Sequence, residues 1–287
     1  MAKGQKVESE KSVALIFQPM LMEARRLADQ CLRIVETAGY TPRLQSAWEL
    51  GPSVSSEGVR LAITFGGDGT IIRAARWLAG TGVPILGVAM GKLGFLTEMQ
   101  PDVVRDRLPS VLAGDYWVDE RSMLAARVES GQQPDGAPAS PLIALNDVVI
   151  ARGASPRVAQ IEVQVDGVPL VKYVADGLVV ATPTGSTAYA LSAGGPVVAP
   201  GVQGVLIVPV AAHLAVLRSM LVPVSARIEV RASADQPTLL VMDGQVQIPL
   251  KNNQPVTVEM AKERTLFART GTPSRFYETL VESLKRR

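Results

Sequence analysis

The sequence predicts an α/β domain with a parallel sheet and flanking helices, followed by an all-β sandwich domain and a C-terminal helix that packs back. In the first part of the chain, short apolar runs typical of buried strands alternate with helical patterns. From about residue 123 apolar and polar residues alternate with a period of two, and helical patterns become rare. We therefore expect an α/β domain over residues 12–122, a β-sandwich over 123–262, and a segment over 263–287 that returns to the N-terminal domain.

The first domain is expected to contain alternating strands and helices. The pattern predicts, in chain order, a strand over 13–17, a helix over 24–38, a strand over 61–65, a helix over 71–79, a strand over 83–88 and a helix over 102–113. The first helix places apolar residues at steps of three and four, and Gly39 ends it. Ligands of such parallel sheets bind beyond the carboxyl ends of the strands.

The second domain is expected to consist of hairpins. Apolar residues alternate with polar ones over 161–165, 228–232 and 256–260. The dipeptides Asp166-Gly167 and Asp243-Gly244 are typical of tight hairpin turns. Residues 131–141 show no periodicity and are expected to form a mobile loop. Residues 1–11 are expected to form a disordered start. The helical pattern returns over 273–285.

Composition limits the class of protein. The chain has 287 residues, 47% of them apolar, and a formal net charge of +2, which gives no support for a nucleic-acid partner. A single cysteine, Cys31, cannot form an intrachain disulfide and suits a reducing compartment. A single histidine, His213, excludes a histidine-rich metal site. With no signal peptide or membrane span in the pattern, we expect a soluble, cytoplasmic protein.

A glycine-rich turn follows the strand over 61–65. It reads Gly66-Gly67-Asp68-Gly69-Thr70 and leads directly into a helical stretch. Backbone N–H groups at a helix N-terminus bind phosphate well, and glycine lets the backbone approach the anion closely. Neither a Walker-type G-x-x-x-x-G-K-[ST] motif nor a G-x-G-x-x-G motif is present.

Asp68 lies in the middle of this turn. As an exposed loop aspartate it could be a simple helix cap, because Asp-Gly is common in turns. Alternatively, its carboxylate takes a proton from a hydroxyl that attacks a bound phosphate, which is phosphoryl transfer. Three glycines around one aspartate favour the second interpretation.

Two further stretches indicate a ligand site. Five hydroxyl groups lie within nine residues, at Thr184, Ser186, Thr187, Tyr189 and Ser192. A capped helix explains one or two of them, whereas a heterocycle-binding turn explains all five. The adjacent Asn146 and Asp147 interrupt an apolar strand, which is costly unless they are bonded, and ribose hydroxyls are suitable partners. A solvated strand edge explains this pair equally well.

Together these stretches resemble the NAD kinase family over nearly the whole chain. The motifs that carry the resemblance are Gly66–Thr70, Gly94-Phe95-Leu96-Thr97-Glu98, Asn146-Asp147, Asp176-Gly177, and Thr182-Pro183-Thr184-Gly185-Ser186-Thr187-Ala188-Tyr189 with Ser192-Ala193-Gly194-Gly195-Pro196. The resemblance implies transfer of the terminal phosphate of ATP to the 2′-hydroxyl of the adenosine ribose of NAD, giving NADP. It also implies a homo-oligomer, a dimer or tetramer.

The resemblance also assigns roles by position. Asp68 would be the catalytic base, and Gly66, Gly67, Gly69 and Thr70 would meet the phosphates. The remaining binding residues that it implies are Arg73, Phe95, Asn146, Asp147, Arg157, Asp176, Thr187, Ala188, Tyr189, Ser192 and Gln245. No residue is assigned as a metal ligand, because Mg²⁺ is expected to arrive with ATP.

The chain departs from the family pattern at one position that bears on NAD binding. Many bacterial members have arginine where this chain has Val174, and the lost cation could weaken a phosphate contact. Two alternatives therefore stay open. A lipid kinase of the diacylglycerol or sphingoid type would share the glycine turn but would not need Asn146-Asp147. A non-catalytic NAD(P)-binding sensor would not need Asp68.

Overall fold

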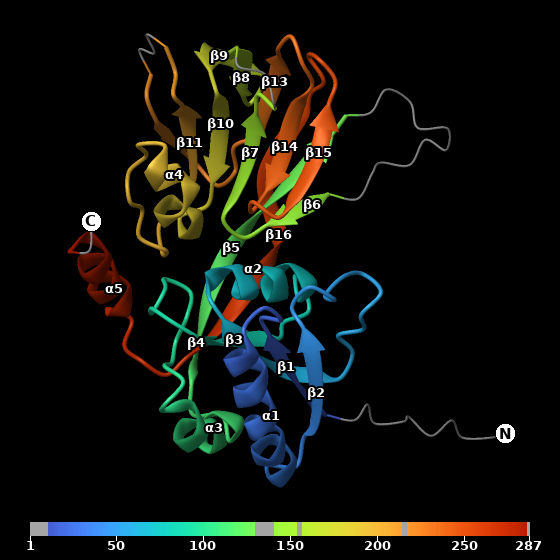
Figure 1. Cartoon of the computed structure of the whole chain (residues 1–287). Coiled ribbons are helices and arrows are strands. Elements are labelled where there is room, and N and C mark those ends of the chain that lie inside the picture. Colours follow the sequence, from blue (N-terminus) through green and yellow to red (C-terminus); the bar gives the residue numbers. More distant parts are fainter. Residues whose placement is uncertain (1–10, 130–140, 154–156, 214–216, 286–287) are drawn as a thin grey trace, which may run out of the picture. The chain divides into compact units, whose positions relative to one another are not determined.

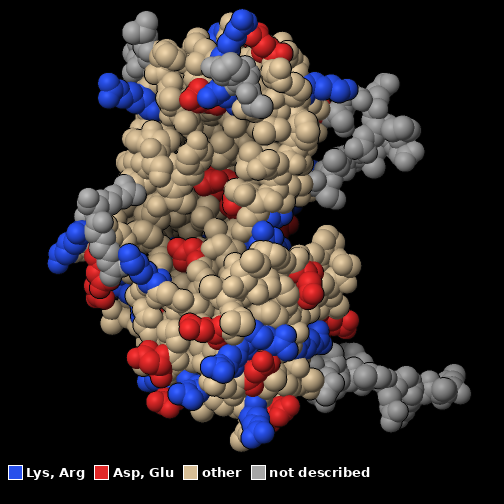
Figure 2. Space-filling model, viewed as in Figure 1, with Lys and Arg blue, Asp and Glu red and all other residues tan. Residues whose placement is uncertain are grey.

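The computed structural model describes residues 11–129, 141–153, 157–213 and 217–285. The expected disordered start and mobile loop therefore lie almost entirely outside the described residues. The chain divides into two compact units, one made of Met1–Glu120 with Thr265–Arg287 and the other of Arg121–Arg264. Among the described residues, no helix combines the length and the apolar character that crossing a bilayer would require. Figure 2 shows Lys and Arg mixed with Asp and Glu over the visible surface.

The first unit contains a parallel sheet with strand order β2-β1-β3-β4, and the end of β16 pairs with β4 (Figure 1). Its strands are β1 (Ser12–Phe17), β2 (Thr41–Ser46), β3 (Val59–Gly66) and β4 (Pro84–Ala89). Its helices are α1 (Met22–Thr37), α2 (Asp68–Trp77), α3 (Val104–Leu112) and α5 (Arg275–Leu284). The α/β part of the predicted fold class is confirmed.

Helices cover both faces of this sheet. The apolar faces of α1 and α3 form one core cluster with alternate residues of β3, such as Leu61, Ile63 and Phe65. On β4, Leu86 and Val88 belong to this cluster, so Gly87 between them lies on the opposite face, because strand residues alternate between faces. A side chain at Gly87 would meet Ile71 of α2. Helix α2 therefore packs on the opposite face.

The second unit is a sandwich of two antiparallel sheets. One sheet has the order β12-β11-β10-β7-β14-β15, and the other runs β16-β13-β8-β9 with β5 and β6 alongside. Its elements are β5 (Trp117–Val128), β6 (Leu142–Ala144), β7 (Asp147–Ala151), β8 (Ala159–Val165), β9 (Val168–Ala175), β10 (Gly177–Ala181), η1 (Thr184–Thr187), α4 (Tyr189–Ser192), β11 (Val205–Val210), β12 (Met220–Val222), β13 (Ile228–Ser233), β14 (Thr238–Met242), β15 (Val246–Leu250) and β16 (Val256–Arg269).

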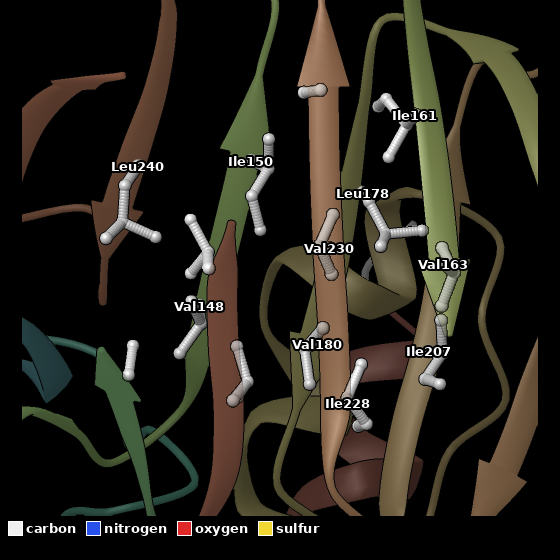
Figure 3. Close-up of a cluster of buried hydrophobic side chains, with 14 of the residues drawn as sticks. Val148, Ile150, Ile161, Val163, Leu178, Val180, Ile207, Ile228, Val230 and Leu240 are labelled. Atoms are coloured by element: carbon white, nitrogen blue, oxygen red, sulfur yellow. The ribbon is translucent and has the colours of Figure 1, made fainter. Parts of the chain in front are cut away.

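The core of the sandwich lies between the two sheets (Figure 3). Val148 and Val180 project from β7 and β10 of one sheet, and Ile161 and Val230 project from β8 and β13 of the other. The polar residues between them point outward, which accounts for the period of two in the sequence. The β-sandwich part of the predicted fold class is confirmed.

Both predicted hairpin turns are present. Asp166-Gly167 joins β8 to β9, and Asp243-Gly244 joins β14 to β15. All four residues have a positive φ, between 51° and 80°, which aspartate and glycine tolerate better than most residues. This is the backbone twist that the two-residue loop between Val165 and Val168 requires, whereas the loop between Met242 and Val246 has three residues because it also contains Gln245.

Candidate active site

The glycine turn lies at the carboxyl end of β3, where it leads into α2. Gly67 precedes the helix, and its carbonyl accepts the N–H of Thr70 at 3.0 Å. Gly67 and Gly69 are exposed, and a Cβ on either would meet no other atom within 4 Å. The N-terminus of α2 is thus open to an anion of phosphate size.

Thr70 is buried beneath this turn. Its side chain occupies the space that a side chain at Gly66 would need, so Gly66 must lack one. Arg73 follows one turn later on α2 and is half-buried. The turn therefore exposes backbone atoms at its surface, and the buried side chain of Thr70 packs against Gly66 on its inner side.

Asp68 is not the exposed loop aspartate that we expected from the sequence. It is the first residue of α2, is half-buried, and accepts the N–H groups of Phe95 at 3.2 Å and Leu96 at 3.3 Å. Its carboxylate fills the space that a side chain at Gly94 would occupy. A segment that lies 27 and 28 residues further along the chain thus holds the carboxylate in one orientation.

Burial raises the pKa of Asp68 above its ordinary value. The hydrogen bonds from Leu96 and Phe95 act in the opposite direction, as does the positive charge of Arg269. The result is a fixed carboxylate with increased proton affinity in a glycine turn at the N-terminus of α2. A general base needs both properties.

Arg269 anchors the segment that holds Asp68. It is 6% exposed, and its Nη1 donates to the carbonyl of Leu96 at 3.0 Å and lies 3.3 Å from Oε2 of Glu98. Its Nε donates to Asp119 at 3.2 Å. The sequence pattern did not indicate Arg269, because its partners are distant along the chain.

Glu98 completes this network from a fully buried position. Its Oε1 accepts the N–H of Thr270 at 2.9 Å, the N–H of Gly271 at 2.8 Å and the hydroxyl of Thr270 at 3.0 Å. Phe95 lies close by, with its ring centroid 5.8 Å from that of Phe276 on α5. The C-terminal segment therefore supports the segment from Gly94 to Glu98, which orients Asp68.

Asn146 and Asp147 lie in the second unit, where β6 leads into β7. They are 9% and 4% exposed. Oδ1 of Asn146 is buried and has no hydrogen-bond partner among the residues that the structure describes. Burial, followed by the negative charge of Asp243, raises the pKa of Asp147 to about 7. Polar groups in such a state need a partner, and a ligand can provide it.

The stretch from Thr182 to Ser192 lies against this pair. The N–H of Thr182 donates to the carbonyl of Asn146 at 2.9 Å, and the backbone of Asn146 fills the space next to Gly185. A side chain at Gly185 would clash with that backbone. The structure therefore brings together two stretches that the sequence indicated separately.

The hydroxyl groups in this stretch do not all require a ligand, and this corrects our interpretation of all five. Ser186 is buried, donates to Pro183 and accepts the N–H of Val198 at 2.9 Å. Thr184 is buried and accepts from Arg121 at 3.2 Å. The hydroxyl groups of Ser186 and Thr184 therefore have partners within the protein and do not need a ligand. Of the candidate binding residues in this stretch, Thr187 and Ala188 are half-buried, and Tyr189 and Ser192 are exposed.

The other candidate residues of the second unit have protein partners. Asp176, just before β10, lies 2.6 Å from Arg152, and the exposed Arg157 lies 2.7 Å from Asp235. Gln245 lies in the β14–β15 hairpin, and its N–H donates to Met242 at 2.9 Å. Asp176 precedes β10, whereas Thr182, which bonds to Asn146, follows it. The length of β10 therefore separates Asp176 from Asn146-Asp147.

Comparison with protein families identifies both units. Residues 13–116 match the family model described as the ATP-NAD kinase N-terminal domain, and residues 145–270 match the ATP-NAD kinase C-terminal domain. Curated proteins named NAD kinase include one from Chloroflexus aurantiacus that is 40% identical over 279 residues, covering 96% of this chain and 98% of that protein. Another from Geobacter metallireducens is 38% identical, with the same coverage of both chains.

Solved structures have the same fold. A crystal structure of an NAD kinase from Archaeoglobus fulgidus in complex with ATP superposes with a TM-score of 0.74 at 25% identity, covering 94% of this chain and 98% of that chain. A crystal structure of yeast NADH kinase complexed with NADH superposes with a TM-score of 0.83 at 23% identity, covering 97% and 89% of the two chains.

Proposed function

Because this chain belongs to the NAD kinase family, we propose that Asp68 is the general base with which it phosphorylates NAD. The enzyme transfers the terminal phosphate of ATP to the 2′-hydroxyl of the adenosine ribose of NAD, and the product is NADP. The observation that carries the assignment is the orientation of Asp68 by two backbone N–H groups at the edge of an open helix N-terminus.

The chemistry requires a base because a ribose hydroxyl holds its proton tightly. A carboxylate within hydrogen-bond reach removes this proton as the new bond to phosphorus forms. Backbone groups of Gly67 and Gly69 at the start of α2 stabilise the charge on the phosphate oxygens during transfer. Arg73, one turn along the same helix, is proposed to contact the phosphates as well.

The direct test is to incubate the purified chain with ATP, Mg²⁺ and NAD and to measure NADP. Parallel reactions with NADH and with diacylglycerol as acceptors define the substrate class. Formation of NADP with no phosphorylated lipid is the expected result. Phosphorylation of diacylglycerol instead of NAD would overturn the proposed acceptor.

Magnesium is proposed to reach the site bound to ATP. Within the part of the chain that the structure describes, no group of three or more His, Cys, Asp or Glu side chains is placed to hold a metal ion. The phosphates of ATP can supply the oxygen ligands that Mg²⁺ prefers, and the ion neutralises their charge.

We predict that chelation abolishes activity without changing the fold. Protein treated with EDTA and desalted should keep its thermal midpoint, and activity should return when Mg²⁺ is added with ATP. Differential scanning calorimetry and metal analysis check this result. A stoichiometric metal that remains after chelation, or a large fall in thermal midpoint, would show a protein-held metal instead.

The nucleoside part of NAD is proposed to bind the second unit. Asn146 and Asp147 would hold ribose hydroxyls, and the segment from Thr187 to Ser192 would line the adenine. The other residues proposed to contact the dinucleotide are Phe95, Arg157, Asp176 and Gln245. The unpartnered Oδ1 of Asn146 and the buried carboxyl of Asp147 support the ribose assignment.

Replacing Tyr189 with alanine should raise the KM for NAD by roughly tenfold and change kcat by less than about threefold. The ring is 45% exposed and can stack on a heterocycle equally well in the ground state and the transition state, so its loss acts on binding. Steady-state kinetics with NAD varied at saturating ATP provide the measurement. Tyr189→Phe should behave like the parent, and Trp48→Ala, another exposed aromatic, controls for surface effects. A normal KM with a collapsed kcat would contradict the role.

The enzyme is proposed to be a cytoplasmic homo-oligomer. Strand β9 lies at the end of its sheet and exposes Val168, Leu170 and Val174, an apolar edge that suits contact between copies. Cys31 is buried and unpaired, which suits a reducing compartment. Analytical ultracentrifugation tests the oligomeric state, and a monomer at micromolar concentration would overturn it.

A further inference from the structure

Asp243 lies in the β14–β15 hairpin, and its carboxylate binds the turn that carries Asn146 and Asp147. Oδ1 accepts the N–H of Asn146 at 2.7 Å and that of Asp147 at 3.2 Å, while Oδ2 accepts the N–H of Leu145 at 2.9 Å. The N–H of Asp243 donates in return to the carbonyl of Asp147 at 3.0 Å. One side chain therefore satisfies three consecutive backbone donors.

We propose that Asp243 is a positioning residue that fixes the Asn146-Asp147 pair for the dinucleotide. This inference rests on the proposed role of that pair in holding ribose. Asp243 does not touch the substrate in this scheme. It acts through the geometry of the turn and through its negative charge.

The turn is also fixed from the opposite side. The hydroxyl of Thr182 donates to the carbonyl of Leu145 at 2.7 Å and accepts the N–H of Gly185 at 3.0 Å. The N–H of Thr182 donates to the carbonyl of Asn146. The carbonyl groups of Leu145 and Asn146 are thus held by the segment that leads to Tyr189, whereas Asp243 holds the N–H groups of the turn and the carbonyl of Asp147. The backbone of the turn is therefore held within the protein, and the side chains of Asn146 and Asp147 are proposed to bind the ligand.

The backbone conformation of the β14–β15 hairpin favours aspartate or asparagine at position 243. Asp243 has a φ of 51°, a conformation that aspartate and asparagine adopt at lower cost than other residues with a side chain. Gly244 follows with a φ of 65°. Asparagine at position 243 therefore preserves the turn while it removes the charge, and this makes the substitution informative.

The charge of Asp243 acts on Asp147 at close range. Asp147 lies on β7 between β14, which leads to Asp243, and β10, which presents the uncharged Ala181 and Thr182. Burial and the charge of Asp243 both disfavour the ionised form, and they raise the pKa of Asp147 to about 7. Asp147 can therefore change between hydrogen-bond donor and acceptor near neutral pH.

The test compares Asp243→Asn with Asp166→Asn, a matched control. Asp166 also has a positive φ, also precedes a glycine in a hairpin of the same unit, and its carboxylate also accepts a backbone N–H, that of Arg227 at 2.8 Å. In Asp243→Asn the amide oxygen can still accept two bonds, but its NH₂ group faces the N–H of Leu145. We expect the KM for NAD to rise roughly tenfold, with the KM for ATP within about twofold of the parent. Asp166→Asn should have the same KM for NAD and the same KM for ATP as the parent.

The pH dependence of NAD binding separates positioning from general stability. Isothermal titration over roughly pH 5.5–8.5 should show a titration of affinity near the pKa of Asp147 in the parent. In Asp243→Asn this titration should move on the order of one pH unit lower, because a neighbouring negative charge is gone. Asp243→Glu keeps the charge and displaces the carboxylate, so it should raise the KM for NAD and leave the titration near its original pH.

The outcomes are distinguishable. A rise in KM for NAD with a shifted titration in Asp243→Asn alone supports the inference. An unchanged KM and titration, or equal changes in Asp243→Asn and Asp166→Asn, would overturn it. Asp147→Ala tests the underlying function separately: if it leaves the KM for NAD unchanged, the ribose assignment fails; if it raises the KM while Asp243→Asn does not, only the role of Asp243 fails.

Discussion

Replacing Asp68 with asparagine should lower kcat by roughly 10²–10⁴, the usual effect of removing a general base. This corresponds to about 3–5 kcal/mol of transition-state stabilisation. Asparagine has the same shape, but it cannot accept the proton of the ribose hydroxyl. The affinity for NAD should hold or improve, because a negative charge near the phosphates is lost. Steady-state kinetics combined with a direct NAD titration provide the measurement.

The pH profile provides a second readout for Asp68. Because burial raises the pKa of this carboxyl above its ordinary value, the acid limb of kcat in the parent should lie above the range of an ordinary aspartate. Asp106→Asn is a matched control, since Asp106 lies in the first turn of α3 in the same unit but is exposed. If Asp68→Asn turned over within a few-fold of the parent, the base would be another group.

Replacing Arg269 with methionine should lower the free energy of unfolding by about 3–5 kcal/mol, because it leaves the fully buried carboxylate of Glu98 without its main cation. It should also lower kcat, because Arg269 holds the carbonyl of Leu96 in the segment that orients Asp68. Urea denaturation and kinetics of the folded protein measure the two effects.

A second substitution should restore part of this loss. Glu98→Gln removes the buried charge and keeps an oxygen for the N–H groups of Thr270 and Gly271, so the double variant should be more stable than Arg269→Met alone. Arg25→Met is the control: Arg25 pairs with Asp29 at 3.0 Å on the exposed surface of α1, and its loss should cost at most about 0.5 kcal/mol. Equal effects of Arg25→Met and Arg269→Met would contradict the role of the network.

Local pattern predicted most of the elements of the fold. The apolar spacing of α1 and the alternation in β8 and β13 are both visible within a few residues, and the structure contains them. Strand β2 was not predicted, because its six residues are all half-buried and show no alternation. The continuation of β16 to Arg269 was also missed, since its polar and charged middle does not resemble a buried strand.

The candidate site could be predicted only where its residues form contiguous motifs. Asp68 and Asn146-Asp147 each lie in such a motif, although their roles stay predictions. Asp243 and Arg269 act across 96 or more residues of sequence, so no local spacing reveals them. The sequence showed Asp243 only as a turn residue. Its contact with three donors depends on the pairing of β14 with β7, a tertiary feature.

The partners of Glu98 are synthesised long after Glu98 itself. Arg269 and Gly271 follow it by 171 and 173 residues. At 5–20 residues per second, a ribosome needs roughly ten to thirty seconds to cover that distance. During this interval the nascent chain already carries β1 to β4, yet the segment that orients Asp68 lacks its anchor. The proposed catalytic geometry is therefore anchored only after residue 271 has been synthesised, and a product that stops before residue 265 is expected to keep the glycine turn but lack activity.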